Sequence, residues 1–400
     1  MRTLCLTILA AAVVFSLGGC TRGGRVDAVN AEMIPLKNKV ITGYITGKGG
    51  VKLYARIEGD GSPTLVLPGG PGYSFDYLLP VLSELDSSNQ MIFFDPRGCG
   101  RSDRFKNPAL YTLDNMVADV ESLRTTLNIS ALNIIGHETG GMLAQKYAIK
   151  YPTHVNRLIL LSTTAQVSDL AIWLNSFRDF MPRQIAATVK MYERDSLFTD
   201  GRYSDGYERT VLSGIMIPNY FAYAADVPPD FSLPDRSWQV YLEMWGRTGY
   251  FDISGNLKDF DERNDLKTLK IKTLILVGEN DYISPFVMES VGSSIPRAKM
   301  HTFEGAGHFY YIEKRDEFLS VVKEFLANST VHSCFTVSFR QNHQGGFVFQ
   351  ISLISFLSLY SPPTAAPTIN TMHEQYTHTI ATRMKAYAPY TFLNGWKVVR

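Results

Sequence analysis

The chain has 400 residues, is 45% hydrophobic and 19% charged, and carries a formal net charge of +1. This composition is typical of a globular protein that buries a full core, and the length fits one large or two ordinary domains. The net charge is uninformative, but no basic cluster in the sequence suggests a nucleic-acid partner, and the four scattered cysteines predict neither a structural disulfide nor a zinc site.

The first twenty residues predict a targeting segment. Arg2 precedes an apolar run at 4–17 that is too short for a convincing membrane span. The run ends in Leu-Gly-Gly-Cys at Cys20, which resembles a bacterial lipobox, although an ordinary secretory signal cleaved near this point is the alternative. Each buried acyl methylene stabilises anchoring by about 0.8 kcal/mol. We therefore expect lipid anchoring at Cys20 in a bacterial cell envelope, at the outer membrane if the host has two membranes.

The segment after Cys20 leads into a predicted sheet. Residues 21–37 are Gly-rich and polar, which predicts a linker. Residues 40–46 and 51–57 alternate apolar and polar side chains on either side of a Gly-rich turn, which predicts a hairpin. The apolar run 64–67 then breaks into Pro-Gly-Gly-Pro-Gly at 68–72, which indicates a buried parallel strand ending in a loop with an exposed backbone.

Strands and helices alternate along the next part of the chain. Short apolar runs predict the strands, and apolar residues at helical spacing predict the helices. In chain order the pattern predicts a strand at 91–94, a helix from about 112, a strand at 132–135, a helix at 142–149 and a strand at 158–161. This alternation predicts an α/β fold whose sheet is mostly parallel and has helices on both faces.

The alternation stops at 163–270, where aromatic residues are frequent and apolar residues have helical spacing, so we expect an inserted, mainly helical cap. Strands resume at 273–277, and the core therefore comprises 38–162 and 271–328. Residues 329–400 carry few charges, and their prolines break any regular element. We expect them to form a poorly ordered extension that is unrelated to the catalytic unit.

The most informative stretch is Gly-His-Glu-Thr-Gly-Gly at 136–141, which lies between a predicted strand and a predicted helix. In the strand-turn-helix motif G-x-S-x-G, a sharp turn flanked by small residues lifts a nucleophilic serine above the sheet. Gly136 and Gly140 match this motif, but Glu138 stands at the serine position. No other G-x-S-x-G sequence occurs in the chain.

Four motifs in order make residues 37–328 resemble the proline iminopeptidase branch of the α/β-hydrolase family. They are Pro-Gly-Gly-Pro-Gly at 68–72, Asp-Pro-Arg-Gly-Cys-Gly-Arg-Ser at 95–102, the turn at 136–141, and Leu-Lys-Asp-Phe-Asp at 257–261. The resemblance implies the α/β-hydrolase fold, with an inserted helical cap and no metal or organic cofactor. A fold alone does not determine function.

The resemblance also implies three catalytic positions. They are Glu138 at the turn, Asp281 after a predicted buried strand, and His308 in Gly-Ala-Gly-His. In this family the histidine takes the nucleophile's proton, and the acid orients the imidazole and stabilises its cation. An Asp in such a place can instead simply cap a helix, and a lone His can be a surface group. With Glu138 and Asp281 on either side, we expect the pKa of His308 to be raised.

Three further backbone positions are implied as an oxyanion hole, namely Gly69, Gly70 and Thr139. Each such N–H donor contributes about 2.7 to 4 kcal/mol to the stabilisation of a developing oxyanion. The family also recognises a substrate's amino terminus with acidic cap residues, but the matching place here holds Gly249 or Tyr250. The resemblance therefore does not carry aminopeptidase specificity over to this chain.

Four cap aromatics suit an apolar ligand, although each could equally pack within the cap. They are Trp173, Trp238, Trp245 and Tyr250. The predicted partner is a small molecule or short peptide, together with a membrane reached through the lipid anchor. The sequence leaves the oligomeric state open.

The functional hypotheses differ in the role that they give to Glu138. A carboxylate that attacks an amide or ester forms an anhydride that collapses backwards, whereas attack on a saturated carbon forms an ordinary ester that water can hydrolyse. The leading hypothesis is a cell-envelope hydrolase that acts on a small apolar or peptide-like compound. The alternatives are a catalytically silent ligand-binding or scaffold lipoprotein, and epoxide-hydrolase-like or dehalogenase-like chemistry with a carboxylate nucleophile.

Overall fold

A computed structural model describes residues 31–36, 40–180, 183–194, 196–200, 203–211, 235–327, 335–341 and 347–353. The predicted signal segment with Cys20, most of the linker and most of the C-terminal extension lie outside these ranges. Within them, no helix combines the length and the apolar character needed to cross a membrane.

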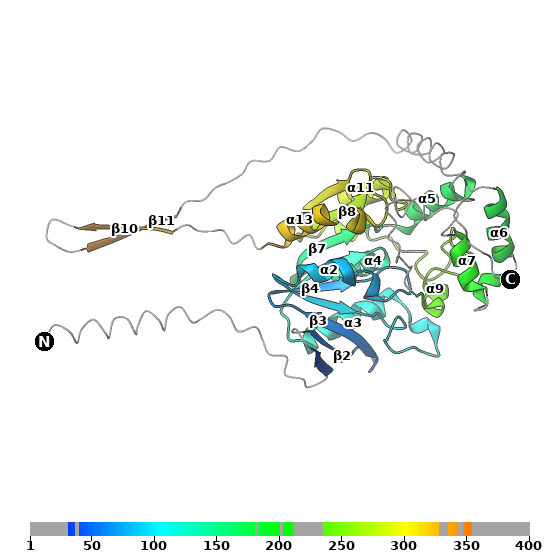
Figure 1. Cartoon of the computed structure of the whole chain (residues 1–400), viewed down its shortest axis with the longest axis horizontal. Helices are drawn as coiled ribbons and strands as arrows, with labels where there is room; N and C mark the ends of the chain where they lie inside the picture. The colour runs from blue at the N-terminus through cyan, green and yellow to red at the C-terminus, as the bar shows by residue number, and fades with distance from the viewer. Residues whose placement is uncertain are drawn as a thin grey trace.

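A nine-stranded sheet forms the centre of the molecule (Figure 1). Its order in space is β1(Ala31–Leu36), β2(Val40–Thr46), β3(Lys52–Glu58), β5(Asn89–Phe94), β4(Ser62–Leu67), β6(Leu132–His137), β7(Val155–Leu161), β8(Lys272–Gly278) and β9(Ala298–Phe303). The strands from β5 to β9 run parallel, and β1, β2 and β3 add an antiparallel edge. The prediction of an α/β fold with a mostly parallel sheet is confirmed.

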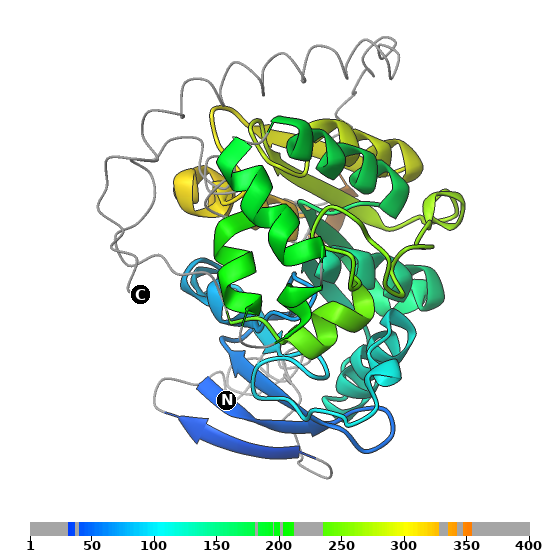
Figure 2. The ribbon, with the colours of Figure 1, turned by 90° about the vertical axis from the view of Figure 1, so that its right-hand side faces the viewer.

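Helices cover both faces of the sheet, which explains why its central strands are continuous apolar runs (Figure 2). Every residue of β6 is buried. The helices outside the cap are α2(Leu79–Leu82), α3(Leu113–Thr126), α4(Thr139–Lys150), α11(Pro285–Ser294), α12(Tyr310–Glu313) and α13(Arg315–Leu326), and the short α10(Arg263–Leu266) lies at the end of the cap segment, just before β8. The first turn of α3 is capped by Thr112, whose hydroxyl accepts a hydrogen bond of 3.2 Å from the Asn115 N–H.

The segment between β7 and β8 carries the helices expected of the cap. They are α5(Val167–Phe180), α6(Arg183–Arg194), α7(Ser204–Val211) and α9(Trp238–Met244). Figure 1 shows these helices gathered at one end of the molecule. Trp245 and Tyr250, which follow α9, line a cavity together with residues at the carboxyl ends of the strands.

Two expected boundaries differ in the structure. The predicted linker extends too far, because β1 lies within it and pairs with β2, from Ala31 opposite Ile45 to Leu36 opposite Val40. Within the extension expected to be poorly ordered, β10(Phe335–Gln341) and β11(Phe347–Leu353) form an antiparallel pair. The sequences of β10 and β11 alternate apolar and polar residues, a pattern that favours strand pairing and that composition alone does not reveal.

The run at 95–102 has a structural role, which its buried ion pair between Arg97 and Asp119 illustrates. Arg97 donates two hydrogen bonds of 2.7 Å to the Asp119 carboxylate, and both side chains are buried. The Lys48 N–H also donates to Asp119, at 2.9 Å. The carboxylate of Asp119 thus joins the loop after β5 to α3 and to the β2–β3 turn.

Removing Asp119 should therefore destabilise the whole domain. Asp119→Ala leaves the Arg97 guanidinium buried without its partner, and we expect the free energy of unfolding to fall by about 3–5 kcal/mol. Urea unfolding followed by tryptophan fluorescence measures the loss. Asp261→Ala is the control, because it breaks an exposed pair with Arg263 and should cost less than about 1 kcal/mol. Equal losses in the two variants would contradict the assignment.

Candidate functional site

The site is built on the turn between β6 and α4. Glu138 occupies this turn with φ 47° and ψ −118°, a sparsely populated conformation that costs about 1–3 kcal/mol in a non-glycine residue. Packing enforces it: a Cβ at Gly136 would lie 2.5 Å from the Gly140 oxygen, and a Cβ at Gly140 would lie 2.2 Å from the Leu67 oxygen. The Thr163 hydroxyl also donates to the Glu138 carbonyl at 2.6 Å. The turn therefore presents the Glu138 side chain at the carboxyl end of the sheet.

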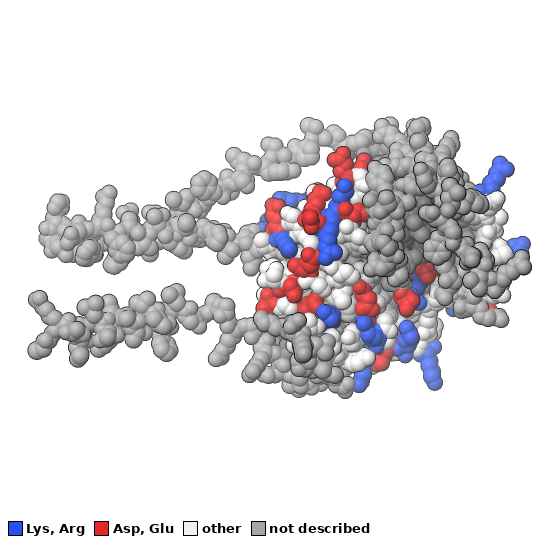
Figure 3. Space-filling model, in the orientation of Figure 1, with Lys and Arg blue, Asp and Glu red and all other residues white. Residues whose placement is uncertain are grey.

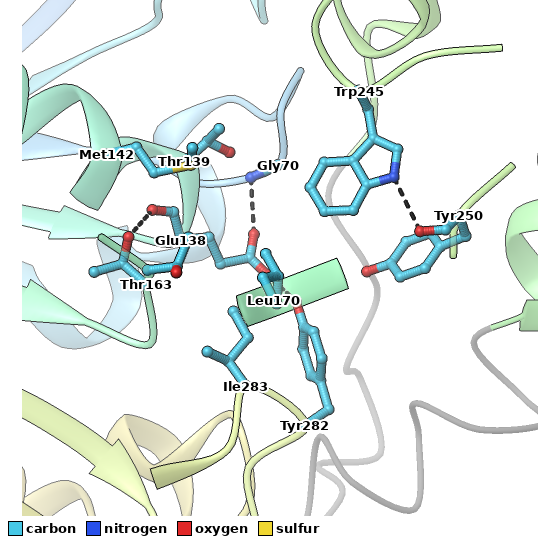
Figure 4. A pocket seen from close by; sticks show the side chains of 11 residues that line it. Gly70, Glu138, Thr139, Met142, Thr163, Leu170, Trp245, Tyr250, Tyr282 and Ile283 are labelled. Carbon is cyan, nitrogen blue, oxygen red and sulfur yellow. Dashed lines mark hydrogen bonds between the residues drawn. The ribbon is translucent and has the colours of Figure 1, made fainter. Parts of the chain in front are cut away.

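Three donors from three separate segments surround the Glu138 carboxylate, which is only 8% exposed. The Gly70 N–H donates to Oε2 at 2.8 Å (Figure 4). The Tyr282 hydroxyl donates to Oε1, and His308 Nε2 lies 3.2 Å from the same oxygen. The carboxylate also lies at the N-terminus of α4, where the helix dipole favours a negative charge.

Asp281 holds the other side of the His308 ring. Its Oδ1 lies 2.8 Å from His308 Nδ1 and accepts a hydrogen bond of 2.8 Å from the Ile283 N–H. Its Oδ2 accepts a hydrogen bond of 2.6 Å from the Ser162 hydroxyl. The structure thus brings together Glu138, Asp281 and His308, the three residues that the sequence motifs indicated as catalytic positions.

The charges in this group stabilise one another. Burial opposes the cation of His308, but the adjacent carboxylates of Asp281 and Glu138 outweigh it and raise the pKa of His308 to about 9. Burial also opposes ionisation of Glu138, but hydrogen bonding to His308 and Tyr282 and the charge of His308 lower the pKa of Glu138 to about 2. At neutral pH the site therefore contains an imidazolium between two carboxylates.

The predicted oxyanion hole is only partly reproduced. Gly70 directs its N–H at Glu138, but the Gly69 N–H donates instead to the Tyr77 hydroxyl at 2.7 Å. Thr139 lines the adjoining cavity. Counted from Cβ, a glutamate side chain has as many heavy atoms as a serine side chain that carries a small acyl group. Oε2 therefore occupies the place at Gly70 that the carbonyl oxygen of such an acyl group would take.

A small cavity of about 20 Å³, enough for about one water molecule, adjoins the carboxylate. Its walls are Gly70, Glu138, Thr139, Met142, Thr163, Thr164, Leu170, Trp245, Tyr250, Tyr282 and Ile283. Most of this surface is apolar, and Figure 4 shows the Tyr250 hydroxyl pointing into it. The cavity therefore suits an apolar group placed next to the Glu138 carboxylate.

Of the four predicted pocket aromatics, Trp245 and Tyr250 line this cavity, whereas Trp173 and Trp238 do not. Trp173 is buried, and its indole N–H donates to the Tyr282 carbonyl. Trp238 packs edge-to-face on Tyr241, with ring centroids 5.1 Å apart. The spacing of aromatics in the sequence could not separate residues that face the cavity from residues that support it.

Sequence reasoning missed two groups next to the catalytic positions. Tyr282 directly follows Asp281, and the position of a phenol next to a predicted catalytic acid could have identified it from the sequence. His137 precedes Glu138 and is neutral, because burial lowers its pKa to about 3. Its Nδ1 lies 2.7 Å from the Tyr77 hydroxyl, the group that accepts from Gly69. His137 and Tyr77 thus support the loop that carries Gly70.

One group of side chains in the described ranges approaches a metal site, namely His137, Glu138 and His308. Their ligand atoms lie within 4.8 Å of one another, whereas two ligand atoms on one tetrahedral zinc ion lie roughly 3.3 Å apart. His308 also makes contacts to a carboxylate through each ring nitrogen. The geometry fits a hydrogen-bonded ion pair better than a metal centre.

The cap supplies carboxylates, but they pair within the cap. The Glu193 carboxylate lies against Gly249, where a Cβ would come within 2.3 Å of its Oε1, and accepts a hydrogen bond of 2.7 Å from Tyr207. Glu208 accepts a hydrogen bond of 2.8 Å from Arg236. Among the described residues, neither of these two carboxylates lines the cavity beside Glu138.

Comparison with known proteins identifies relatives of this chain. A profile of the family described as "alpha/beta hydrolase fold" matches residues 63–315. The chain is 32% identical over 285 residues to a proline iminopeptidase of Lactobacillus helveticus (strain DPC 4571), covering 69% of this chain and 95% of the relative. It is 29% identical over 293 residues to one from Heyndrickxia coagulans, covering 71% and 98%.

A solved structure shares the fold. The crystal structure of a proline iminopeptidase from Mycobacterium smegmatis superimposes with a TM-score of 0.57 and 21% identity. The superposition covers 74% of this chain and 97% of that protein. At this identity the likeness supports the fold and does not extend to the chemistry of the site.

The ion pair predicts a defined pH dependence of stability. Because the folded pKa of His308 is raised from 6.5 to about 9, its stabilisation is complete below about pH 6.5 and is lost as pH rises through about 9. Glu138→Gln removes one carboxylate charge, so the pKa of His308 should fall and the stabilisation should be lost at lower pH. NMR titration of the ring protons and urea unfolding between pH 6 and 9, roughly this window, measure both effects.

Asp261→Asn removes one charge from an exposed pair with Arg263 outside the site and should leave the titration of His308 unchanged. An equal His308 pKa in the Glu138→Gln protein and the parent would show that Glu138 does not stabilise the imidazolium.

Proposed function

Because the chain belongs to the α/β-hydrolase fold family, in its proline iminopeptidase-like branch, we propose that it is a hydrolase whose nucleophile is the Glu138 carboxylate. The proposed substrate is a small apolar or peptide-like molecule with an electrophilic saturated carbon, such as an epoxide or an alkyl halide. The proposed place of action is the bacterial cell envelope, with the chain anchored through lipid at Cys20.

The position of the two carboxylate oxygens carries the proposal. Oε2 is held by the Gly70 N–H, Oε1 lies beside His308 and the Tyr282 hydroxyl, and Glu138 lines the apolar cavity. An ester or amide carbonyl has no access to the Gly70 donor while Oε2 occupies it. A saturated carbon needs no oxyanion donor for the first step, and the low pKa of Glu138 keeps the carboxylate in its nucleophilic form.

In the first step with an epoxide, Oε1 attacks a ring carbon and the carbon–oxygen bond of the ring breaks. The departing alkoxide takes the proton of the His308 imidazolium, whose Nε2 lies 3.2 Å from Oε1. The products of this step are a neutral hydroxyalkyl ester of Glu138 and a neutral His308. Loss of the Glu138 charge also removes one of the two carboxylates that held the proton on the ring.

In the second step the neutral His308, oriented by Asp281, takes a proton from water. The water oxygen attacks the ester carbon, and the Gly70 N–H stabilises the negative charge that develops on the carbonyl oxygen. The alcohol leaves with the proton from His308, and the resulting Glu138 acid returns a proton to the ring. Overall, one epoxide and one water give one diol, and the site returns to its ion pair.

A second candidate function is a ligand-binding or scaffold lipoprotein without turnover. The observation that favours it is the saturation of the carboxylate, which contacts Gly70, Tyr282 and His308 at once and leaves a cavity of only about 20 Å³. In such a protein the ion pair would serve stability alone. The two candidates make different predictions for Glu138.

The nucleophile prediction is tested by trapping. His308→Gln cannot activate water, and a halide leaves without needing a proton from His308, so incubation with a panel of short-chain alkyl halides should build up an ester on the peptide that contains Glu138. Intact-protein and peptide mass spectrometry detect the adduct. In a single turnover in ¹⁸O water, the parent should incorporate the label into Glu138 and not into the product. Label in the product alone, or the same adduct in His308→Gln/Glu138→Gln, would refute the ester route.

The oxyanion prediction is tested by restoring the hydroxyl. Glu138→Ser removes the carboxylate from the Gly70 donor and frees His308 as a base, so hydrolysis of short-chain p-nitrophenyl esters should rise at least about tenfold above the parent. Glu138→Ala is the matched control, because it empties the donor without supplying a nucleophile. Equal rates in the Ser and Ala variants would show that His308 and Gly70 do not form a working acyl-transfer site.

A further inference from the structure

A cluster of cations lies at the end of the sheet opposite the site. Five side chains at the amino ends of β7, β8 and β9 and in the adjoining loops form this basic face: Arg157, Lys270, Lys272, Arg297 and Lys299. They line two adjoining hollows of about 690 and 500 Å³, which share Arg157, Lys272 and Arg297. All but the half-buried Arg157 are exposed.

Few negative side chains lie near the cations of the basic face. Among the described residues, none of the five cations makes an ion pair, and Glu324 is the single carboxylate that lines either hollow. The nearby His301 ring is paired with Glu317 at 2.9 Å. Figure 3 shows a face of the molecule over which acidic and basic side chains are interspersed. Like charges held together repel, so an anionic partner would stabilise this face.

Backbone contacts hold the two arginines in place. Arg157 donates to the Ala327 carbonyl at 3.1 Å, and its buried Nε has no hydrogen-bond partner. Arg297 donates to the Lys270 carbonyl at 3.1 Å. Carbonyl contacts position a guanidinium without neutralising it. The cations are therefore partly preorganised and keep their full charge.

We propose that the basic face docks on a membrane surface that contains anionic phospholipids. Its cations are spread over three strands and two loops, which suits many headgroups in a plane better than one phosphate ion. Apolar side chains lie among the cations, including Met300, Val321 and Phe325, and can contact the upper acyl region. Each Lys or Arg near such a surface tightens binding by roughly fivefold.

The chain's own C-terminal extension is a poor alternative occupant. It follows directly after Ala327, which lines one of the hollows. Residues 328–400 contain a single carboxylate, Glu374, and five cations: Arg340, Arg383, Lys385, Lys397 and Arg400. Their net positive charge would add to the repulsion.

Docking by this face would orient the site. Glu138 follows β6 and Asp281 follows β8, so both lie at the carboxyl end of the parallel strands, whereas the cations lie at the amino ends of β7, β8 and β9 in the same sheet. Seven residues of strand span roughly 23 Å. The cavity would thus face away from the membrane, and the basic face would be a second membrane signal beside the lipid proposed at Cys20. This inference does not depend on the proposed chemistry.

Vesicle binding by the full chain tests the proposal. Cys20→Ser prevents lipidation, and the measured quantity is the ratio of its partition coefficients on phosphatidylcholine vesicles with and without phosphatidylglycerol. Taking this ratio cancels binding through the apolar N-terminal segment. The ratio should exceed one and fall with salt. Adding Lys272→Glu and Lys299→Glu should lower it by at least roughly thirtyfold, because two cations are lost and two carboxylates are added.

Lys190→Glu with Lys258→Glu is the matched control, since both lysines are exposed in the cap segment and the change in net charge is the same. This control variant should retain most of the preference for anionic vesicles that the Cys20→Ser protein shows. Equal ratios for the two double variants would overturn the proposal. Displacement from anionic vesicles by inorganic phosphate at constant ionic strength would also overturn it, because the face would then bind free phosphate.

Discussion

The site depends on one constraint: the buried negative charge of Glu138 must be stabilised by hydrogen-bond donors and a positive charge close to it. Glu138 is placed almost out of water by the turn after β6, where an ionised carboxylate without partners would be strongly destabilising. Its partners arrive from segments far apart in the chain: Gly70 after β4, Tyr282 after β8 and His308 after β9. The loops at the carboxyl ends of the parallel strands are thus held together by one side chain.

The residues behind these partners position them without touching the reacting groups. Asp95 accepts a hydrogen bond of 3.1 Å from the Phe75 N–H and one of 2.9 Å from the Arg101 N–H, which links the loop after β5 to the loop that carries Gly70. Trp173 does the same for the Tyr282 backbone, and Ser162 for Asp281. The family motif at 95–102 therefore supports the donors rather than supplying chemistry, which is why its presence could not decide whether Glu138 is catalytic.

The exchange of serine for glutamate changes what the same scaffold can do. With serine at this turn, the Gly70 N–H would be open to a substrate carbonyl, and His308 would face a single carboxylate. With glutamate, the donor is occupied and the imidazole keeps its proton at neutral pH. In the mechanism that we propose, the scaffold is thus shifted from attack on carbonyl carbon towards attack on saturated carbon, because only the latter reaction benefits from an oriented, fully ionised carboxylate.

The sequence by itself determined the α/β class, the order of the strands and helices in the core, and the positions of Glu138, Asp281 and His308. It could do so because buried parallel strands are continuous apolar runs and because strand-end loops carry short motifs. Only the tertiary structure decided that Gly69 turns its N–H to Tyr77, that Tyr282 contacts Glu138, and that Trp173 and Trp238 support rather than line the cavity. The same holds for the basic face, whose cations are separated by up to about 140 positions in the chain. The physical reason is that side-chain direction and the pairing of distant loops depend on how the strands pack, which local residue patterns do not encode.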